Sequence, residues 1–337
     1  MKLEGKKVIL VLGGLDTSGG MFNYLKAWIN EHNENGADVG VCAIPEVLEK
    51  LDDVDRKIAL PYHENEDLKK IYLSLINGTY ADKLNDIRKE VEKIDVDFLH
   101  FVDETIFYPY LKKIAKSIPH VITVHDPIYH PGQFKKITTR ILCLVSRLSY
   151  FTSRKLTIHL HSKRNIFPSI LFFYKRKVHH HHPLPKRIFN SDVITNRNPI
   201  IAFMGRIEKY KGIDLFIDSI KFFEDTYKKE IEVMIIGNGN FNKQSLNKIS
   251  YPVKIENRFV EDIEFHKFMS QIDVLVLPYL SATQSGVGYL AKSYNKKIIC
   301  TNVGNLPDLI ENESQGYVVN KTKESIAKAI NEIIKYN

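Results

Sequence analysis

The sequence contains few cysteines. Cys42, Cys143 and Cys300 are far apart, and no CxxC pair occurs. An odd number of widely spaced cysteines argues against a disulfide framework and is typical of proteins in a reducing compartment. We therefore expect a cytoplasmic protein.

Long apolar runs are also absent. No run reaches the roughly 18 residues that a membrane-spanning helix needs. The first twenty residues, MKLEGKKVILVLGGLDTSGG, have a short apolar core, an acid (Glu4) among the charges and no small-residue cleavage site. This pattern predicts a first β-strand and not a signal peptide.

Two ligand-binding signatures are missing as well. No D-x-D triplet stands at a plausible strand end, and the acidic stretch 52–55 is typical of a solvated surface. Neither half of the chain shows G-x-G-x-x-G after a strand with an acid on the next strand, which argues against a dinucleotide-binding dehydrogenase.

The composition is that of a soluble globular protein. The 337 residues are 44% hydrophobic and 26% charged, with a formal net charge of +8. A chain of this length exceeds what one hydrophobic core usually holds, so we expect two domains.

Apolar, β-branched runs alternate with helix-like segments along the chain. Such continuous apolar strands are typical of parallel sheets that are covered on both faces. The sequence thus predicts an α/β fold of two doubly wound domains, residues 1–187 and 188–337, joined within 183–199. A helix is expected at 322–337, and it is expected to pack back on the first domain. The predicted strands lie at 7–14, 37–44, 97–102, 120–125, 156–161, 199–205, 231–237, 253–256, 273–278 and 297–304.

Glycine-rich and basic stretches follow several predicted strands, where open α/β sheets bind their ligands. Gly19 and Gly20 begin a helix and would allow a phosphate or sugar to approach backbone N–H groups, although a simple chain reversal explains them equally well. Arg206 and Lys211 follow the strand at 199–205, near another helix start. Taken alone, the pair favours a solvated surface over a diphosphate site.

The loop PYLSATQSGVGYLAKS, residues 278–293, has the layout of an anion-binding turn that runs into a helix. It contains no acidic residue. Backbone N–H groups around Gln284, Ser285, Gly286 and Val287 would meet a phosphate there.

Four segments occur in one order along the chain: GGMFNYLKAWINE at 19–31, MGRIEKYKGIDLFIDSI at 204–220, MIIGNGN at 234–240, and 257–311. Together they resemble glycosyltransferases of the GT-B fold, similar to family 4 of the nucleotide-sugar-dependent enzymes. The resemblance covers nearly the whole chain and is strongest in the second half. It implies two Rossmann-like domains that face a central cleft, with the acceptor bound by the first and the nucleotide sugar by the second.

The resemblance also implies roles for single residues at the donor. Arg206 and Lys211 match the basic pair that holds the diphosphate. Gly237 and Gly239 match the loop near the nucleotide, and Arg258, Phe259 and Val260 the loop against the base. Gly19 and Gly20 match the glycine loop near the donor phosphates and sugar. Asp308 stands where a glutamate is usual.

The chain departs from the family pattern at two positions that usually carry glutamates. One alignment places Thr283 and Ala291 there, and another places Gln284 and Lys292. In neither case is a carboxylate present to contact the ribose or the donor sugar. The turn that meets the phosphates is retained. The loop A-T-Q-S-G is therefore interpreted as a variant of the family's loop, while a binding-only protein without activity stays an alternative.

His125 and Asp126 are the candidates for touching the sugar or for orienting or deprotonating the acceptor. The resemblance places His125 at the strand end that faces the transferred sugar; a histidine satisfied by its neighbours is the alternative. Arg206, Lys211 and the helix start at Ser285 are expected to stabilise the leaving group without a metal or other cofactor. Family membership implies a retaining reaction.

The run of four histidines at 179–182 does not predict a metal site. Adjacent residues of an extended chain point to opposite faces, so four consecutive rings do not converge on one ion. The run is expected to end the last strand of the first domain and to begin the connection to the second.

No aspartate or glutamate occurs from Gln133 to Lys177. A basic, partly apolar segment of this kind can bind anionic lipid head groups. We therefore expect the region 133–177 to dock on the inner face of a membrane, with an ordinary basic surface as the alternative. No nucleic-acid partner is expected, since no recognition motif accompanies the charge. The cations are Lys135, Lys136, Arg140, Arg147, Arg154, Lys155, Lys163, Arg164, Lys175, Arg176 and Lys177.

Two functional classes follow. The first is a hexosyltransferase that uses a UDP- or GDP-sugar and a saccharide or lipid-linked acceptor in bacterial surface polysaccharide synthesis. The second is a non-catalytic partner of another transferase that binds sugar nucleotides or carbohydrates.

Overall fold

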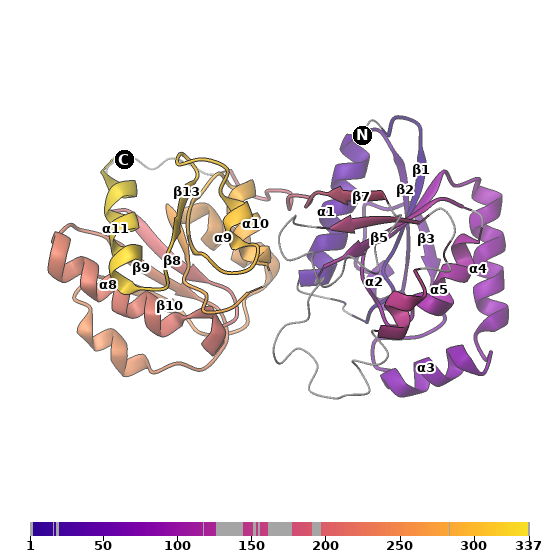
Figure 1. Cartoon of the computed structure of the whole chain (residues 1–337), viewed down its shortest axis with the longest axis horizontal. Coiled ribbons are helices and arrows are strands. Elements are labelled where there is room, and N and C mark those ends of the chain that lie inside the picture. The colour runs from indigo at the N-terminus through magenta and orange to yellow at the C-terminus, as the bar shows by residue number, and fades with distance from the viewer. Residues whose placement is uncertain are drawn as a thin grey trace. The chain divides into compact units, whose positions relative to one another are not determined.

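The structure is a computed structural model. It describes residues 3–15, 17, 20–116, 118–125, 144–150, 153, 156–160, 177–190, 197–282 and 284–335. The chain divides into two compact units, Met1–Pro183 and Leu184–Asn337. Each unit is built on one parallel β-sheet (Figure 1), as the alternating pattern predicts.

The first unit contains a seven-stranded sheet in the order β3-β2-β1-β4-β5-β6-β7. Its strands are β1 (Lys7–Val11), β2 (Asp38–Ala43), β3 (Arg56–Ala59), β4 (Phe98–Phe101), β5 (His120–Val124), β6 (Leu156–Leu160) and β7 (Lys177–His180). Its helices are α1 (Gly20–Glu34), α2 (Pro45–Leu48), α3 (Leu68–Ile76), α4 (Ala81–Ile94) and α5 (Tyr108–Ala115), with a further helical turn at 144–148. The β1 run is apolar throughout because Val8 to Val11 are fully buried, which requires cover on both faces of the sheet.

The second unit contains a six-stranded sheet in the order β10-β9-β8-β11-β12-β13. Its strands are β8 (Ile200–Met204), β9 (Glu232–Ile236), β10 (Val253–Glu256), β11 (Val274–Leu277), β12 (Lys297–Thr301) and β13 (Gly316–Val319). Its helices are α8 (Ile213–Tyr227), α9 (Asp262–Gln271), α10 (Gly286–Ser293) and α11 (Lys323–Ile334), with 3-10 turns η2 (Lys209–Lys211), η3 (Lys243–Lys248) and η4 (Leu306–Leu309).

Alternate residues of the second sheet belong to two separate cores, because successive side chains of a strand point to opposite faces. Phe203 and Val276 join the core that includes α8 and α11. Met204 and Leu277 join the core that includes α9 and α10. The helix α11 packs against α8 of its own unit. That it also reaches the first unit stays a prediction.

The ten predicted strands are all present. The histidine run ends β7 at His180, as expected. The sequence analysis missed two short strands, β3 and β13, of four residues each. Both lie at the edge of a sheet, where a strand needs less apolar sequence.

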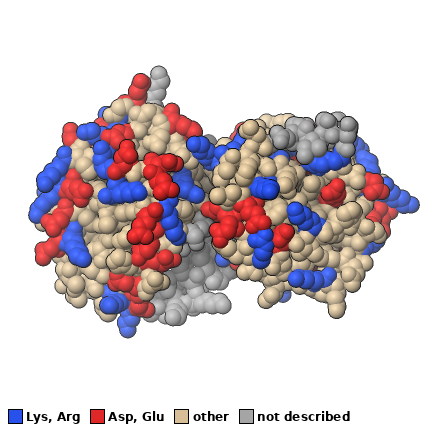
Figure 2. Space-filling view, turned by 180° about the vertical axis from the view of Figure 1, so that it is seen from behind, with Lys and Arg blue, Asp and Glu red and all other residues tan. Residues whose placement is uncertain are grey.

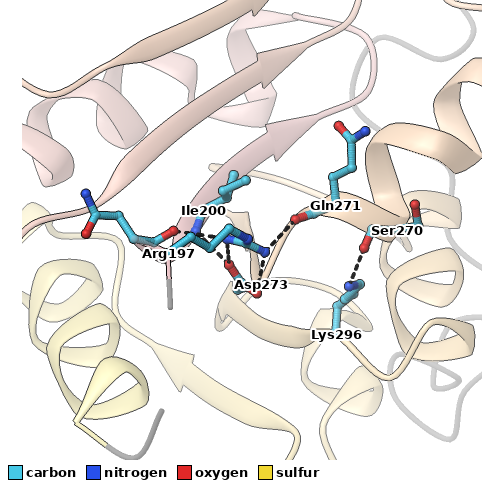
Figure 3. Close-up of polar contacts among 7 residues, drawn as sticks. Arg197, Ile200, Ser270, Gln271, Asp273 and Lys296 are labelled. Atoms are coloured by element: carbon cyan, nitrogen blue, oxygen red, sulfur yellow. Dashed lines mark hydrogen bonds and ion pairs between the residues drawn. The ribbon is translucent and has the colours of Figure 1, made fainter. Parts of the chain in front are cut away.

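An ion pair fastens the amino end of the second sheet (Figure 3). Both terminal nitrogens of Arg197 contact the Asp273 carboxylate, at 2.6 and 3.0 Å, and the backbone N–H of Ile200 donates to the same carboxylate at 2.8 Å. Beside it the Lys296 ammonium donates to the carbonyl of Ser270 at 2.8 Å. Because parallel strands carry their ligands at the opposite, carboxyl end, this cluster is structural.

Candidate functional site: a basic cradle at the switch point of the second sheet

The strand order of the second sheet reverses between β8 and β11, which run side by side in the same direction. Ligands of open α/β sheets bind at such a switch point, beyond the carboxyl ends of the strands. Here those ends lead into the loop 205–212 and the loop 278–285. The carbonyl of Tyr210 accepts the backbone N–H of Leu280 at 2.7 Å, so the two loops are hydrogen-bonded to one another.

Three glycines bring the backbone at this edge into close contact. Gly205 has φ +106°, Gly237 +137° and Gly239 +152°. A Cβ atom would lie 2.0 Å from the carbonyl oxygen of Gly205 if added at Gly237, and 2.0 Å from that of Ile207 if added at Gly239. The predicted site glycines 237 and 239 are therefore required by close packing of the chain itself, whatever they do for a ligand.

Lys211 and the start of α10 meet beside Gly205. A Cβ added at Gly205 would lie 3.4 Å from the ammonium nitrogen of Lys211 and 3.1 Å from a methyl group of Val287. Lys211 is half-buried, and burial lowers its pKa, with the Arg206 charge adding to the effect. Within the described residues Lys211 forms no ion pair with a carboxylate. A shielded ammonium of this kind is typical of a ligand site.

Arg206 differs from Lys211 in its exposure. Its side chain is 77% exposed, and its guanidinium lies 3.3 Å from the Glu208 carboxylate. A surface contact of this kind is weak, so Arg206 can exchange its partner for a ligand at small cost. The structure thus supplies one fixed and one adaptable cation on the same loop.

The loop before α10 forms an open helix start. Ser285 is the N-cap residue, and its side-chain oxygen accepts the N–H of Gly288 at 3.2 Å. Gly286 is exposed, and no atom lies within 4 Å of where its Cβ would be. Backbone N–H groups at Gly286 and Val287 belong to the first turn of α10, where a helix has donors without an intrahelical acceptor. Gln284 precedes them, and Thr283 lies outside the described residues.

Neither position expected for the second missing glutamate is open. Ala291 is fully buried in the core that contains α9 and α10. The Lys292 ammonium is paired with the Glu311 carboxylate at 2.5 Å. Asp308 lies in η4, and its charge adds to the effect of burial in raising the pKa of Tyr289. The chain thus offers no carboxylate at either position, in agreement with the sequence.

The segment 258–260, predicted to lie against the base, leaves β10 at the edge of the sheet. The Arg258 guanidinium contacts the carboxylates of Glu264 and Glu256, at 2.5 and 3.1 Å. Phe259 is 65% exposed, while Val260 is buried in the core. Of the three side chains, Phe259 is therefore the one that is open to a ligand.

In the first unit the strand order reverses between β1 and β4, and a buried carboxylate joins the two strand ends. Asp103 accepts the N–H of Gly13 at 2.9 Å. The sequence analysis missed Asp103; its position directly after a strand was the available signal. Gly20 begins α1 and is exposed, whereas Gly19 lies outside the described residues.

His125 directly follows β5 and is held by two neighbours. Its Nε2 lies 2.9 Å from the carbonyl oxygen of Val102, so Nε2 carries a proton. Its ring packs edge-on against Tyr24 of α1, with centroids 4.6 Å apart. The ring of His182 also packs edge-on against Tyr24, with centroids 5.2 Å apart. Asp126 lies outside the described residues.

Further histidines contact residues of α1. His32 and Trp28 of α1 pack on His100 of β4, with His32 Nε2 and His100 Nδ1 at 3.4 Å. Burial lowers the pKa of His32 to about 4. The Nε2 of His181 contacts the Glu31 carboxylate at 2.7 Å. Among the described residues no three His, Cys, Asp or Glu side chains are grouped so as to hold a metal ion.

The basic region 133–177 lies mostly outside the described residues. One of its cations was wrongly assigned to the surface: Arg147 is buried and contacts both oxygens of Glu104, at 2.5 and 3.0 Å, so it cannot reach a lipid. Figure 2 shows one face of the molecule, where basic and acidic side chains are interspersed. In the described part of the chain, no helix combines the length and the apolar character needed to span a bilayer.

Comparison with known proteins agrees with this architecture. Residues 198–336 match the family model of glycosyl transferases group 1. Spore coat protein SA of Bacillus subtilis is 20% identical over 285 residues, which cover 78% of this chain and 74% of that protein. An uncharacterized glycosyltransferase of Methanocaldococcus jannaschii is 24% identical over 323 residues, covering 86% and 83%. The structure of Anabaena HepE in complex with UDP-glucose superposes with a TM-score of 0.63 at 16% identity, covering 98% of this chain and 90% of HepE.

The two parallel-sheet units have the GT-B fold of glycosyltransferases. The matched residues span nearly all of the second unit, which is thus similar in sequence to glycosyl transferases of group 1.

Proposed function

We propose that this protein is a glycosyltransferase of the group 1 type, which moves a hexose from a UDP- or GDP-sugar to a saccharide or lipid-linked acceptor. One observation carries the proposal. The half-buried Lys211 ammonium, which has no carboxylate partner among the described residues, lies beside a strand end and the open start of α10. A cation, an exposed second cation and free N–H groups together fit a diphosphate.

The chemistry needs little more than these groups. The bond between the anomeric carbon and the diphosphate oxygen breaks, the acceptor oxygen bonds to that carbon, and the acceptor proton leaves. The negative charge that develops on the diphosphate is stabilised by Lys211, Arg206 and the N–H groups of Gly286 and Val287. No metal is needed to neutralise that charge, so we expect turnover to continue in the presence of EDTA.

The nucleoside is expected beside the segment 258–260. Phe259 offers an exposed ring face on which a base can stack, while Arg258 is held by two carboxylates. Anabaena HepE, with the same fold, was solved with UDP-glucose, which favours a uridine nucleotide here.

The acceptor is assigned to the first unit, near His125. Nε2 of His125 donates a hydrogen bond to the carbonyl oxygen of Val102. The neutral ring therefore carries its basic lone pair on Nδ1. That atom is the candidate for contacting the sugar or accepting the acceptor proton, together with Asp126. Retention of the anomeric configuration, and a role in bacterial surface polysaccharide synthesis, are expected from the family resemblance.

A thermal-shift panel of UDP-, GDP-, dTDP- and CMP-sugars tests the donor. Saturating donor at a hundredfold excess over Kd should raise the free energy of unfolding by about 2.7 kcal/mol. Lys211→Ala and Arg206→Ala should remove that stabilisation and the hydrolysis of the donor. Binding without turnover of any acceptor would favour the alternative, a non-catalytic partner of another transferase. No binding of any of these sugar nucleotides would contradict the proposed transferase and leave only a carbohydrate-binding partner.

We also propose that the segment around 133–177 docks on an anionic membrane surface. In its described part, Leu144, Val145 and Leu148 form one exposed apolar turn, with 47%, 41% and 48% of each residue exposed. Apolar side chains within a basic segment suit the interface of a bilayer. Flotation with vesicles that contain anionic lipid tests this proposal. Changing all three residues to Ser should lower the fraction of protein bound to the vesicles. Binding that depends neither on the salt concentration nor on this triple change would contradict the proposal.

A further inference from the structure

Tyr279 is buried at the centre of the cradle and has no role in the proposed function so far. It directly follows Pro278, at the carboxyl end of β11, and is only 2% exposed. Burial raises the pKa of its hydroxyl to about 12, so the ring is neutral at physiological pH. Its ring face and its hydroxyl each contact a different part of the cradle.

The ring face lies beneath Lys211. The ammonium nitrogen is 5.4 Å from the centroid of the Tyr279 ring, within the range of a cation–π interaction. The neighbouring Tyr210 packs edge-on against Tyr279, with centroids 6.3 Å apart and planes at 82°. The negative face of the Tyr279 ring thus attracts the Lys211 ammonium from one side. The backbone at Gly205 limits the position of the ammonium on another side.

The hydroxyl contacts the helix start. It lies 3.2 Å from the side-chain oxygen of Ser285, the N-cap residue of α10. The same Ser285 oxygen accepts the N–H of Gly288. The Tyr279 carbonyl oxygen, in turn, accepts a hydrogen bond from the Thr301 hydroxyl at 2.6 Å, which anchors the residue to β12.

We propose that Tyr279 is a positioning residue that sets the Lys211 ammonium and the N–H groups of α10 at a fixed separation, so that both reach one diphosphate. The inference rests on the proposed function for the identity of the ligand. The geometry is independent of that function, because the contacts of Tyr279 with Lys211 and with Ser285 are both present in the protein without a donor.

The pair Tyr279→Phe and Tyr279→Leu separates the two contacts. Phe keeps the ring beneath Lys211 and loses only the hydroxyl, so we expect donor affinity to fall about threefold, with an unchanged pH profile. Leu removes the ring as well, so affinity should fall about tenfold or more. In the Leu variant the loss of binding at high pH should begin at a lower pH, because the ammonium has lost a stabilising neighbour.

A double-mutant cycle shows whether the effect passes through Lys211. Inorganic pyrophosphate, UDP and GDP serve as probes of binding to the full chain. In a Lys211→Met background, which weakens binding, Tyr279→Leu should lower the remaining affinity only about threefold, the loss expected for the hydroxyl alone. Equal losses in both backgrounds, with an unmoved pH profile, would overturn the proposal and leave Tyr279 a core residue only.

A matched control and a ligand-free measurement complete the test. Tyr294→Phe removes another buried hydroxyl of this unit, which accepts the N–H of Ile188 at 3.0 Å, and should lower stability without moving the pH profile. NMR titration of the Lys211 ammonium without donor should give a lower pKa in Tyr279→Leu than in Tyr279→Phe; equal pKa values would overturn the inference. Should no nucleotide bind to the wild type, the proposed function fails, while this titration still decides the role of Tyr279.

Discussion

The carbonyl oxygen of Gly205 occupies the space that a side chain at Gly237 would need: a Cβ there would lie 2.0 Å away. The two residues end the neighbouring strands β8 and β9, and the N–H of Gly205 donates to the carbonyl of Ile236 at 2.9 Å. The second sheet can thus carry its loops close together at the cradle only because position 237 has no side chain.

We expect Gly237→Ala to lower the free energy of unfolding by more than about 2 kcal/mol, since it adds a clash with the backbone and an unfavourable positive φ. Gly286→Ala is the matched control. It meets no atom within 4 Å, and its stability should stay within about 1 kcal/mol of the wild type. Urea unfolding measures both variants. Equal stabilities would contradict the packing role of Gly237. Donor affinity should still fall in Gly286→Ala, because the new methyl group stands where the phosphate would lie.

Lys211→Met should stabilise the protein without ligand while it weakens donor binding. Burial lowers the pKa of Lys211, so the unfolded chain holds its proton more tightly than the folded one. The charged ammonium therefore opposes folding at neutral pH, and stability rises as pH increases through the folded pKa.

We expect Lys211→Met to raise the free energy of unfolding by less than about 1 kcal/mol, because the loss of the contact with the Tyr279 ring opposes this gain. Thermal unfolding at pH 7 and above pH 10 measures it, and the gain should shrink at the higher pH. Arg206→Gln, a change in an exposed side chain, should leave stability unaltered and still weaken donor binding. A destabilised Lys211→Met variant at pH 7 would show that its ammonium supports the fold.

The ion pair between Arg197 and Asp273 should contribute to the stability of the second unit. It is half-buried and shared with the N–H of Ile200, so Arg197→Met leaves a shielded carboxylate with one partner fewer. We expect a loss of about 1 to 3 kcal/mol, between the values for exposed and buried pairs. Arg258→Met, which breaks ion pairs at the surface, should change stability little. Donor affinity should be the same in Arg197→Met as in the wild type, because the pair lies at the opposite end of the strands.

His32 should make the first unit sensitive to acid. Its folded pKa is about 4 against 6.5 in the unfolded chain, so the unfolded state binds the proton first. Stability from this residue is present above pH 6.5 and is lost as pH falls towards 4. The shift corresponds to about 3 kcal/mol. Urea unfolding at pH 4 to 7 should show a smaller slope in His32→Phe than in the wild type.

His181→Gln is the control for that measurement, because His181 and Glu31 also influence His32 electrostatically. Removal of His181 should leave most of the pH slope in place. If the pH slope disappeared in His181→Gln and persisted in His32→Phe, His181 and not His32 would be the cause of the acid sensitivity.

Much of the fold could be predicted from the sequence, because continuous apolar runs between helix-like segments have one stable arrangement: parallel strands with both faces covered. The ten strands follow from this pattern. The edge strands β3 and β13 do not follow from this pattern. Each has four residues and pairs with one neighbouring strand, so its sequence carries little periodic signal. The positions of Arg206, Lys211 and the α10 loop at strand ends could also be predicted.

Tertiary structure decided what the side chains at those positions do. Arg147 and Arg206 are both arginines in basic, loop-rich sequence, yet one is buried against Glu104 and the other is 77% exposed. Burial depends on which distant strands and helices pack together, and a local pattern does not contain that information. The sequence by itself determined two parallel α/β sheets and a basic, glycine-bearing edge. Only the packing of β8 beside β11 placed Tyr279 beneath Lys211, because these two residues, 68 positions apart along the chain, become neighbours only at the switch point.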